Sequence, residues 1–205
     1  MNNPPAVKIG IIIAFIQIAI HISFLYIIMN FGLPNTYLNV LLSIFTVAAY
    51  SIVIYFLRAT LVYFDEKRSI VNAFSIYLGL NIALFLAGTA ISYLAKDYHL
   101  FSYAIYLYYV IVLYIVVQSF RVSQPVIKSG FALFAIILLI ITLGNLALPA
   151  AFNFFNVDHH LYAYIHLLSI LPPIGAIIIF NSVAGNSTKT LDHFDGKPLF
   201  KSDPS

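Results

Sequence analysis

The side chains that could do chemistry in this chain are a few imidazoles, amides and hydroxyls set inside long apolar stretches. Gln17 and His21 lie four residues apart, as do Tyr162 and His166, and side chains at this spacing share one face of an α-helix. A neutral polar group without a partner costs a few kcal/mol in an apolar medium, so such faces should meet. We expect one ligand-binding cluster, formed by Gln17, His21, Asn81, Asn145, Tyr162, His166 and Ser169.

Two of these candidates, His21 and His166, allow two interpretations. An imidazole inside a helical bundle most often bonds a neighbouring helix. Paired imidazoles are also the axial ligand set of haem b, which makes haem the only cofactor that the sequence suggests. No carboxylate is close to either histidine in the sequence, so we predict no other metal centre and assign no metal ligands.

Several classes of function are disfavoured by what the apolar stretches lack. All seven carboxylates fall in short polar connectors or in the C-terminal segment, and no Lys or Arg stands in the middle of an apolar stretch. Proton relays and voltage sensors need charged groups at such depth. The chain has no cysteine and no nucleotide-binding glycine loop, and its serines lack the context of a hydrolase nucleophile. We assign no catalytic residues and expect a protein that is not an enzyme.

The elements that position these side chains are membrane-spanning helices. With 62% hydrophobic and 8% charged residues, the chain is far more apolar than a soluble domain. A helix needs about 20 apolar residues to cross the hydrocarbon core. This predicts an all-α protein, a bundle of six transmembrane helices within residues 1–182, with spans near 9–31, 37–61, 70–94, 100–120, 131–152 and 161–180. Residues 183–205 are polar, and we expect a disordered cytoplasmic tail.

The basic residues predict how the bundle is oriented. In the six-span arrangement only Lys96 falls on one side, and the other nine Lys and Arg residues fall on the opposite side. Cytoplasmic loops carry an excess of Lys and Arg, so both termini should lie in the cytoplasm. We therefore expect a multi-pass protein of the cell inner membrane or plasma membrane. Its net charge of +3 follows from this topology and does not suggest a nucleic-acid partner.

Tyrosines are frequent near residues 98–114. Some belong to an interfacial belt, and Tyr106, Tyr109 and Tyr114 continue inward along one predicted helix. They either pack between helices or form an aromatic wall for a flat apolar or lipidic ligand. Pro149, Pro172 and Pro173 interrupt helical hydrogen bonding and are expected to allow bends.

Three functions remain open at this point. The first is a non-enzymatic binding or accessory subunit, in contact with membrane lipids and with other membrane subunits. The second is a permease for a small solute or lipid that uses the polar cluster, with bends at Pro149 and Pro172 for gating. The third is a haem-b redox protein ligated by His21 and His166.

Overall fold

A computed structural model describes residues 7–32, 36–94, 99–155 and 167–194. Every regular element in these ranges is helical, and a short 3₁₀ turn over residues 167–170 precedes the last α-helix. The α-helices are α1 (Val7–Phe31), α2 (Thr36–Tyr63), α3 (Arg68–Leu94), α4 (His99–Phe120), α5 (Pro125–Phe154) and α6 (Leu171–Phe194). The prediction of an all-helical bundle is confirmed.

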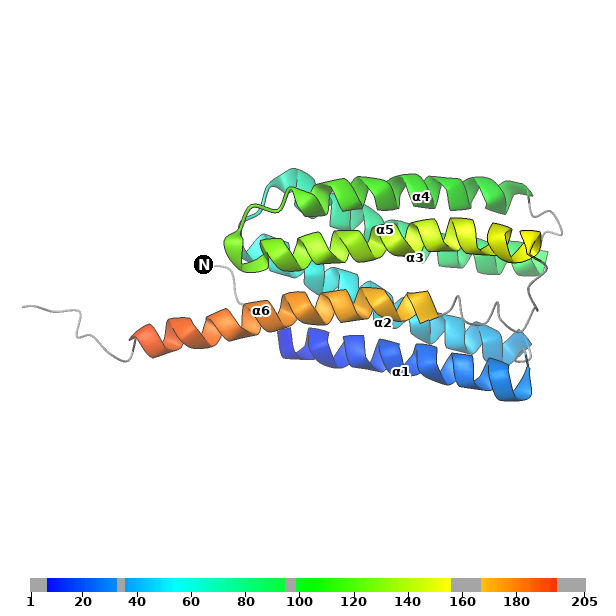
Figure 1. The fold of residues 1–205 in the computed structure, drawn as a ribbon, viewed down its shortest axis with the longest axis horizontal. Helices are drawn as coiled ribbons and strands as arrows, with labels where there is room; N and C mark the ends of the chain where they lie inside the picture. The colour runs from blue at the N-terminus through cyan, green and yellow to red at the C-terminus, as the bar shows by residue number, and fades with distance from the viewer. Residues whose placement is uncertain (1–6, 33–35, 95–98, 156–166, 195–205) are drawn as a thin grey trace, which may run out of the picture.

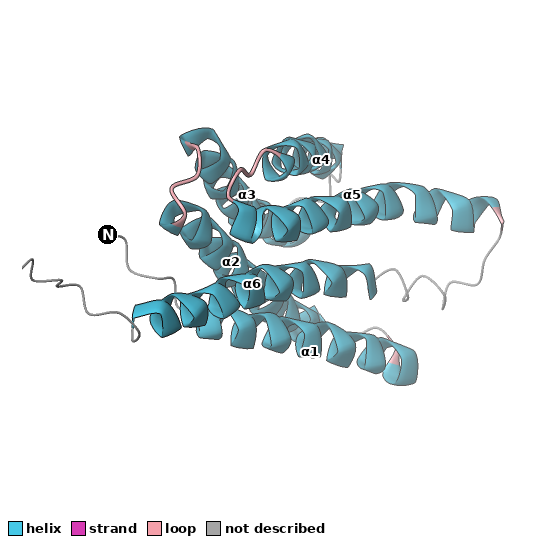
Figure 2. Cartoon of the chain, turned by 60° about the vertical axis from the view of Figure 1, so that its left-hand side comes forward, coloured by secondary structure: helices cyan, strands magenta, loops and turns pink. Residues whose placement is uncertain are grey.

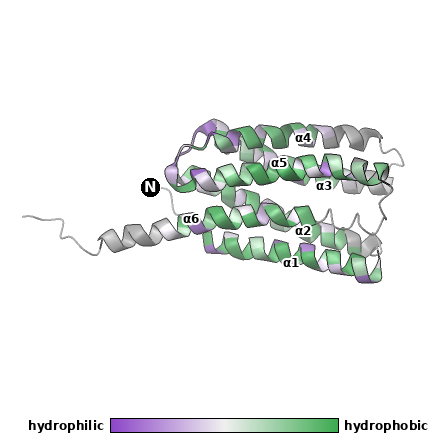
Figure 3. Ribbon diagram, in the orientation of Figure 1, coloured by the Kyte–Doolittle hydropathy of each residue, from purple (hydrophilic) through white to green (hydrophobic). Residues whose placement is uncertain are grey.

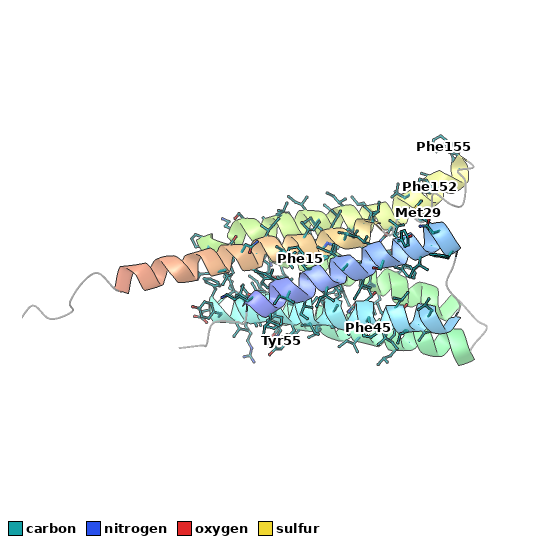
Figure 4. All side chains as sticks on the ribbon, turned by 90° about the horizontal axis from the view of Figure 1, so that it is seen from below. Phe15, Met29, Phe45, Tyr55, Phe152 and Phe155 are labelled. Carbon is teal, nitrogen blue, oxygen red and sulfur yellow. The ribbon has the colours of Figure 1, made fainter. Side chains whose placement is uncertain are left out.

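Five of the helical segments are long and apolar enough to cross a membrane: Val7–Phe31, Val40–Tyr63, Arg68–Gly88, Pro125–Pro149 and Leu167–Gly185. Within the described side chains, α4 contributes the shorter apolar stretch Tyr106–Phe120. The outer surface is apolar along most of its length (Figure 3), and Phe15, Phe45 and Tyr55 point away from the bundle (Figure 4). Phe45 is 56% exposed, which suits contact with lipid and not with water. The chain is therefore a multi-pass membrane protein.

The helices form a closed ring. Each one packs on its neighbours in the sequence, and α6 packs back on α1, so that the last helix completes the ring (Figures 1 and 2). Helices α2 and α6 also touch across the ring. The four connections from α1 to α5 are four residues each, so each of these helices must lie beside the one before it. A closed ring gives every helix an inward face.

One end of the bundle carries the basic residues. Helix α1 begins and α6 ends at this end, together with the α2–α3 and α4–α5 connections (Figure 1). At this end Arg58 of α2 joins two helices, since its Nε donates a hydrogen bond to Ser75 Oγ on α3 at 2.6 Å. We call this the basic end, which is defined by Lys8, Arg58, Lys67, Arg68, Arg121 and Lys128.

A carboxylate ties two connections together at the basic end. Glu66, in the α2–α3 connection, is buried and accepts hydrogen bonds from the backbone N–H groups of Ser123 (2.8 Å) and Gln124 (2.7 Å). These groups precede Pro125, the first residue of α5. The free N–H groups and dipole at a helix N-terminus favour a negative charge. Glu66 therefore caps α5 from another hairpin and fixes the two hairpins relative to each other.

Beside the basic end, the ring is filled by aromatic side chains. Phe74 of α3 packs on Phe131 and Phe134 of α5, with ring centroids 5.6 and 6.3 Å apart. Phe56 of α2 meets Phe180 of α6 at 6.5 Å, which accounts for the contact across the ring. We call this layer the aromatic plug; it consists of Phe56, Phe74, Phe131, Phe134 and Phe180.

The last helix differs from its predicted position. We expected a span near 161–180, whereas the described part of α6 begins at Leu171 after the 3₁₀ turn. Pro172 and Pro173 therefore lie in the first turn of α6, where their missing N–H groups have no intrahelical partner to lose. The helix also continues to Phe194, so residues 183–194 of the expected tail are helical. Helical hydrogen bonding propagates readily once a helix is nucleated by packing.

Candidate functional site

The ring contains a partly open cavity of about 210 Å³ beyond the aromatic plug, on the side away from the basic end. All six helices contribute to its wall. Apolar residues such as Leu138 and Ile141 alternate there with hydroxyl and amide groups, and none of its lining residues is Asp, Glu, Lys or Arg. We call it the polar cavity; its polar lining is Gln17, His21, Thr46, Tyr50, Tyr77, Asn81, Tyr108, Tyr109, Thr142, Asn145 and Ser169.

The structure brings together most of the cluster predicted from the sequence. Five of its members line the polar cavity: Gln17, His21, Asn81, Asn145 and Ser169. They come from α1, α3, α5 and the 3₁₀ turn before α6, which the sequence could not place side by side. The other two members, Tyr162 and His166, lie outside the described residues. The shared location is a structural fact, and the binding role of these residues stays a prediction.

Three tyrosines that were not singled out from the sequence form a row along the cavity. Tyr77 of α3 is central: its hydroxyl is 2.7 Å from that of Tyr50 on α2 and 3.3 Å from that of Tyr108 on α4. Three hydroxyl groups carry three protons, and the two contacts use only two of them. One hydroxyl of the row therefore has a proton left to donate. The signal that could have found the row was a tyrosine near the middle of each of the helices α2, α3 and α4.

Gln17 supplies the complementary group. Its side chain is only 2% exposed, it lines the polar cavity, and its Oε1 has no hydrogen-bond partner in the described part of the chain. An unsatisfied buried acceptor typically costs about 1–3 kcal/mol. Such a group in a native structure calls for an explanation, and a cavity occupant that donates a hydrogen bond provides one.

Two other polar groups of the wall are already satisfied by the protein. Asn81 Nδ2 donates to Ser51 Oγ on α2 at 3.1 Å, and Thr142 Oγ1 donates to the Leu138 carbonyl within α5 at 2.7 Å. Asn145 of α5 lines the cavity and is an exposed residue. The wall thus combines groups fixed by structural hydrogen bonds with groups that still have hydrogen-bonding capacity.

A second cavity, of about 360 Å³, adjoins the first and shares His21, Thr46 and Val47 with it. Its remaining lining is Phe24 of α1, Leu42 and Ser43 of α2, and Phe85 of α3. We call it the adjoining cavity. Because these residues are mostly apolar, the enclosed space changes from polar to apolar along the bundle axis.

The prediction for the tyrosines of α4 is wrong in part. Tyr106 is 64% exposed and Tyr114 is 41% exposed, so both lie on the outside of the ring. Tyr109 does line the polar cavity, together with its neighbour Tyr108. The face that turns inward is set by how α4 packs on α3 and α5, and a helix that is apolar all round does not reveal this face in its sequence.

In the part of the chain that it describes, the structure adds no evidence for a metal or haem site to what the sequence suggested. No group of three or more His, Cys, Asp or Glu side chains within the described ranges is close enough to hold a metal ion. His21 is in place beside the polar cavity, whereas its proposed haem partner His166 lies outside the described residues. The haem hypothesis therefore stays untested.

Fold and site together define a multi-pass helical membrane protein with an uncharged cavity at the centre of its ring. Comparisons with known proteins add no relative: no family model, no curated protein and no solved structure matches this chain. Its function has to be argued from the cavity itself.

Proposed function

We propose that this protein is a non-enzymatic membrane protein that binds a small uncharged ligand in the polar cavity. The observation that carries the proposal is the convergence of all six helices on one cavity with an unpaired buried acceptor, Gln17 Oε1. A cavity with apolar walls and a few convergent polar groups is the usual form of a small-molecule site. Its volume corresponds to about seven water molecules at ~30 Å³ each, which limits the part of the ligand held there.

The ligand should be neutral because of the cavity's lining. Transferring a charged group into an apolar interior is far more costly than transferring a neutral one, unless a counter-charge is present. The wall offers amides and hydroxyls but no carboxylate, ammonium or guanidinium group. We therefore expect neutral polar molecules to bind and charged molecules of equal size to be rejected.

The topology is part of the same proposal. We infer that α4 also crosses the membrane, giving six spans, and that the basic end faces the cytoplasm. The chain has no cysteine, so single-cysteine variants can be labelled specifically. We expect Ser123→Cys, at the basic end, to react with a membrane-impermeant maleimide only after the cells are opened. Asn30→Cys, in the last turn of α1, should react in intact cells; the reverse pattern would invert the topology.

Binding is tested with glycerol and urea as neutral probes, using ligand-observed NMR on the protein in nanodiscs. Acetate and guanidinium serve as charged probes of similar size. We expect the neutral probes to bind and Gln17→Leu to weaken them about 5- to 10-fold, the value of one hydrogen bond. Gln118→Leu is the matched control, because Gln118 is 4% exposed with an unpaired Oε1 but does not line the cavity. Equal effects of the two variants would refute the site.

Passage of the ligand across the membrane is a second candidate function. Its support is that Pro149 lies within α5, where proline weakens the helical hydrogen-bond ladder, and that Pro172 lines the polar cavity at the start of α6. Transport would require the aromatic plug to open towards the basic end. Glycerol uptake by proteoliposomes that exceeds protein-free vesicles and is lost in Asn145→Leu would favour the permease over a binding protein.

The haem alternative has a direct test of its own. Protein purified from cells with ample haem should show a Soret absorption band that is lost in His21→Ala, if His21 is an axial ligand. A spectrum without that band removes this alternative and leaves the proposed binding function unaffected.

A further inference from the structure

We propose that the ligand is an uncharged amphiphile, with its polar head in the polar cavity and its apolar chain in the adjoining cavity. This inference rests on the proposed function and extends it. The two cavities share His21, Thr46 and Val47 in their linings, so they lie side by side. In this proposal one occupant passes these three side chains and extends from the first cavity into the second.

The head must both donate and accept hydrogen bonds. The tyrosine row of Tyr50, Tyr77 and Tyr108 has one proton more than its internal contacts use, and that proton needs an acceptor. Gln17 Oε1 needs a donor. A hydroxyl or amide head meets both requirements at once, whereas an ester or ether head can meet only the first. The lining of both cavities contains no Asp, Glu, Lys or Arg, which favours a neutral head.

The direction of the chain follows from the order of the lining residues. On α1 the lining passes from Gln17 to Phe24, and on α3 from Tyr77 to Phe85, in each case away from the basic end. These steps of seven and eight residues correspond to about 10–12 Å at ~1.5 Å per residue. An apolar chain of that length lies between α1, α2 and α3, while the aromatic plug stops the head from moving further towards the basic end.

The contributions of head and chain to affinity should be unequal. Moving an apolar chain from lipid into an apolar protein cavity exchanges one hydrocarbon surface for another and gains little. A hydroxyl or amide in the middle of a bilayer, by contrast, lacks partners, and the polar cavity supplies them. Changes to the head should therefore alter binding strongly, and chains longer than the adjoining cavity should add little.

The test uses a long-chain alcohol with a photoreactive diazirine on its chain, incorporated into nanodiscs with the intact protein. The matched probe carries a carboxylate in place of the hydroxyl and is used at pH 8. After irradiation, peptide mass spectrometry locates the adducts. We expect the alcohol to label the segments around Phe24, Leu42 and Phe85 at least 10-fold more than the carboxylate does.

Two variants separate this inference from the proposed function. Ser43→Phe fills the adjoining cavity, which Ser43 lines, and leaves the polar cavity unchanged. It should reduce labelling by the alcohol at least 10-fold and change glycerol binding less than 2-fold. Ser69→Phe, at an exposed position in the first turn of α3, is the control and should alter neither. Leu42→Trp fills the same space if Ser43→Phe does not accumulate as folded protein.

The outcomes have distinct meanings. Gln17-dependent glycerol binding without head-selective labelling, or labelling that Ser43→Phe leaves intact, overturns the amphiphile and keeps the proposed binding function. Absence of both glycerol binding and selective labelling overturns both. Equal labelling by alcohol and carboxylate over the outer helical surface means that the probe behaves as bulk lipid, which also contradicts the inference.

Discussion

The two halves of the ring are built from the same helices and differ in how completely their interiors are filled. Around the aromatic plug, Phe74, Phe131 and Phe180 are fully buried and ring packs on ring. Around the tyrosine row the interior holds a partly open cavity of about 210 Å³ and leaves Gln17 Oε1 unpaired. In a membrane, packing and hydrogen bonding hold helices together, since lipid is as apolar as leucine. We therefore expect the plug to contribute most of the stability of the bundle, and the cavity, with its unfilled space and unpaired acceptor, to lower it.

Small residues also bring helices close together on the plug side. A Cβ added at Gly130 on α5 would lie 2.8 Å from Ile179 Cγ1 and 3.3 Å from Ile179 Cα on α6. One added at Gly10 on α1 would lie 2.9 Å from the Phe180 ring. Small residues let backbones approach closely in membrane bundles. Here they bring α6 against both of its neighbours on the plug side, where the ring is closed.

The largest expected effect comes from removing part of the plug. Phe74→Ala should lower the free energy of unfolding by about 3–5 kcal/mol, because it leaves a void between Phe131 and Phe134. Unfolding by SDS titration in mixed micelles measures this change. Phe45→Ala, at a position that is 56% exposed, is the control and should change stability by less than about 0.5 kcal/mol. Similar losses for both variants would mean that the plug has no special role in stability.

The next largest effect concerns the cap that joins the hairpins at the plug side. Glu66→Ala should lower the free energy of unfolding by about 2–3 kcal/mol, since two backbone N–H groups that bond a carboxylate lose their partner. The same SDS titration applies. Asp65→Asn is a fitting control because Asp65 has a positive φ of 53°, which Asn tolerates. A neutral Glu66→Ala would show that water replaces the cap without loss.

A smaller effect, with opposite signs at two glycines, tests the close packing of α5 on α6. Gly130→Ala should destabilise by about 1–3 kcal/mol, because the new methyl group collides with Ile179. Gly79→Ala on α3 meets nothing within 4 Å and should stabilise by about 0.5–1 kcal/mol through helix propensity. Thermal unfolding in detergent compares the two. Equal signs would show that α6 moves to accommodate the methyl group.

The smallest effect is expected in the cavity half, and its sign is the reverse of that in the plug. Gln17→Leu should raise the free energy of unfolding of the ligand-free protein by about 1 kcal/mol, because an unpaired buried acceptor is removed. Asn81→Leu should lower it by a similar amount, since it leaves the Ser51 hydroxyl without its partner. SDS titration of both variants measures these two changes in the free energy of unfolding. A clear loss of stability in Gln17→Leu would contradict our view that this acceptor is kept for a ligand.

Much of the fold could be predicted because the hydrophobic runs are long and the connectors short. The predicted ends at Phe31, Leu94 and Phe120 coincide with the ends of α1, α3 and α4. The predicted start of the last span, at residue 161, lies outside the described residues; within them α6 begins at Leu171, and hydropathy alone does not register the prolines in its first turn. The candidate cluster was assembled from helical spacing, and its members in the described ranges do share one cavity.

The tyrosine row escaped prediction for a reason that applies to apolar helices in general. Tyr50 and Tyr77 stand in apolar helices that carry other tyrosines and phenylalanines, and a tyrosine can face lipid near an interface as readily as it can face another helix. Tyr106 and Tyr108 are two residues apart on α4, yet the first is exposed and the second lines the cavity. Only the rotation of each helix in the ring distinguishes them.

By itself the sequence determined that this chain lies in a membrane, that it is helical, and where its charges gather, because transfer energies and backbone hydrogen bonding in lipid act on each segment alone. The tertiary structure decided which faces turn inward: it closed the ring with α6 on α1, filled one half with phenylalanine, and brought Gln17, Asn81 and Tyr77 to one cavity. These features depend on close packing between helices distant in the sequence, and in lipid no difference in polarity marks the inward face beforehand.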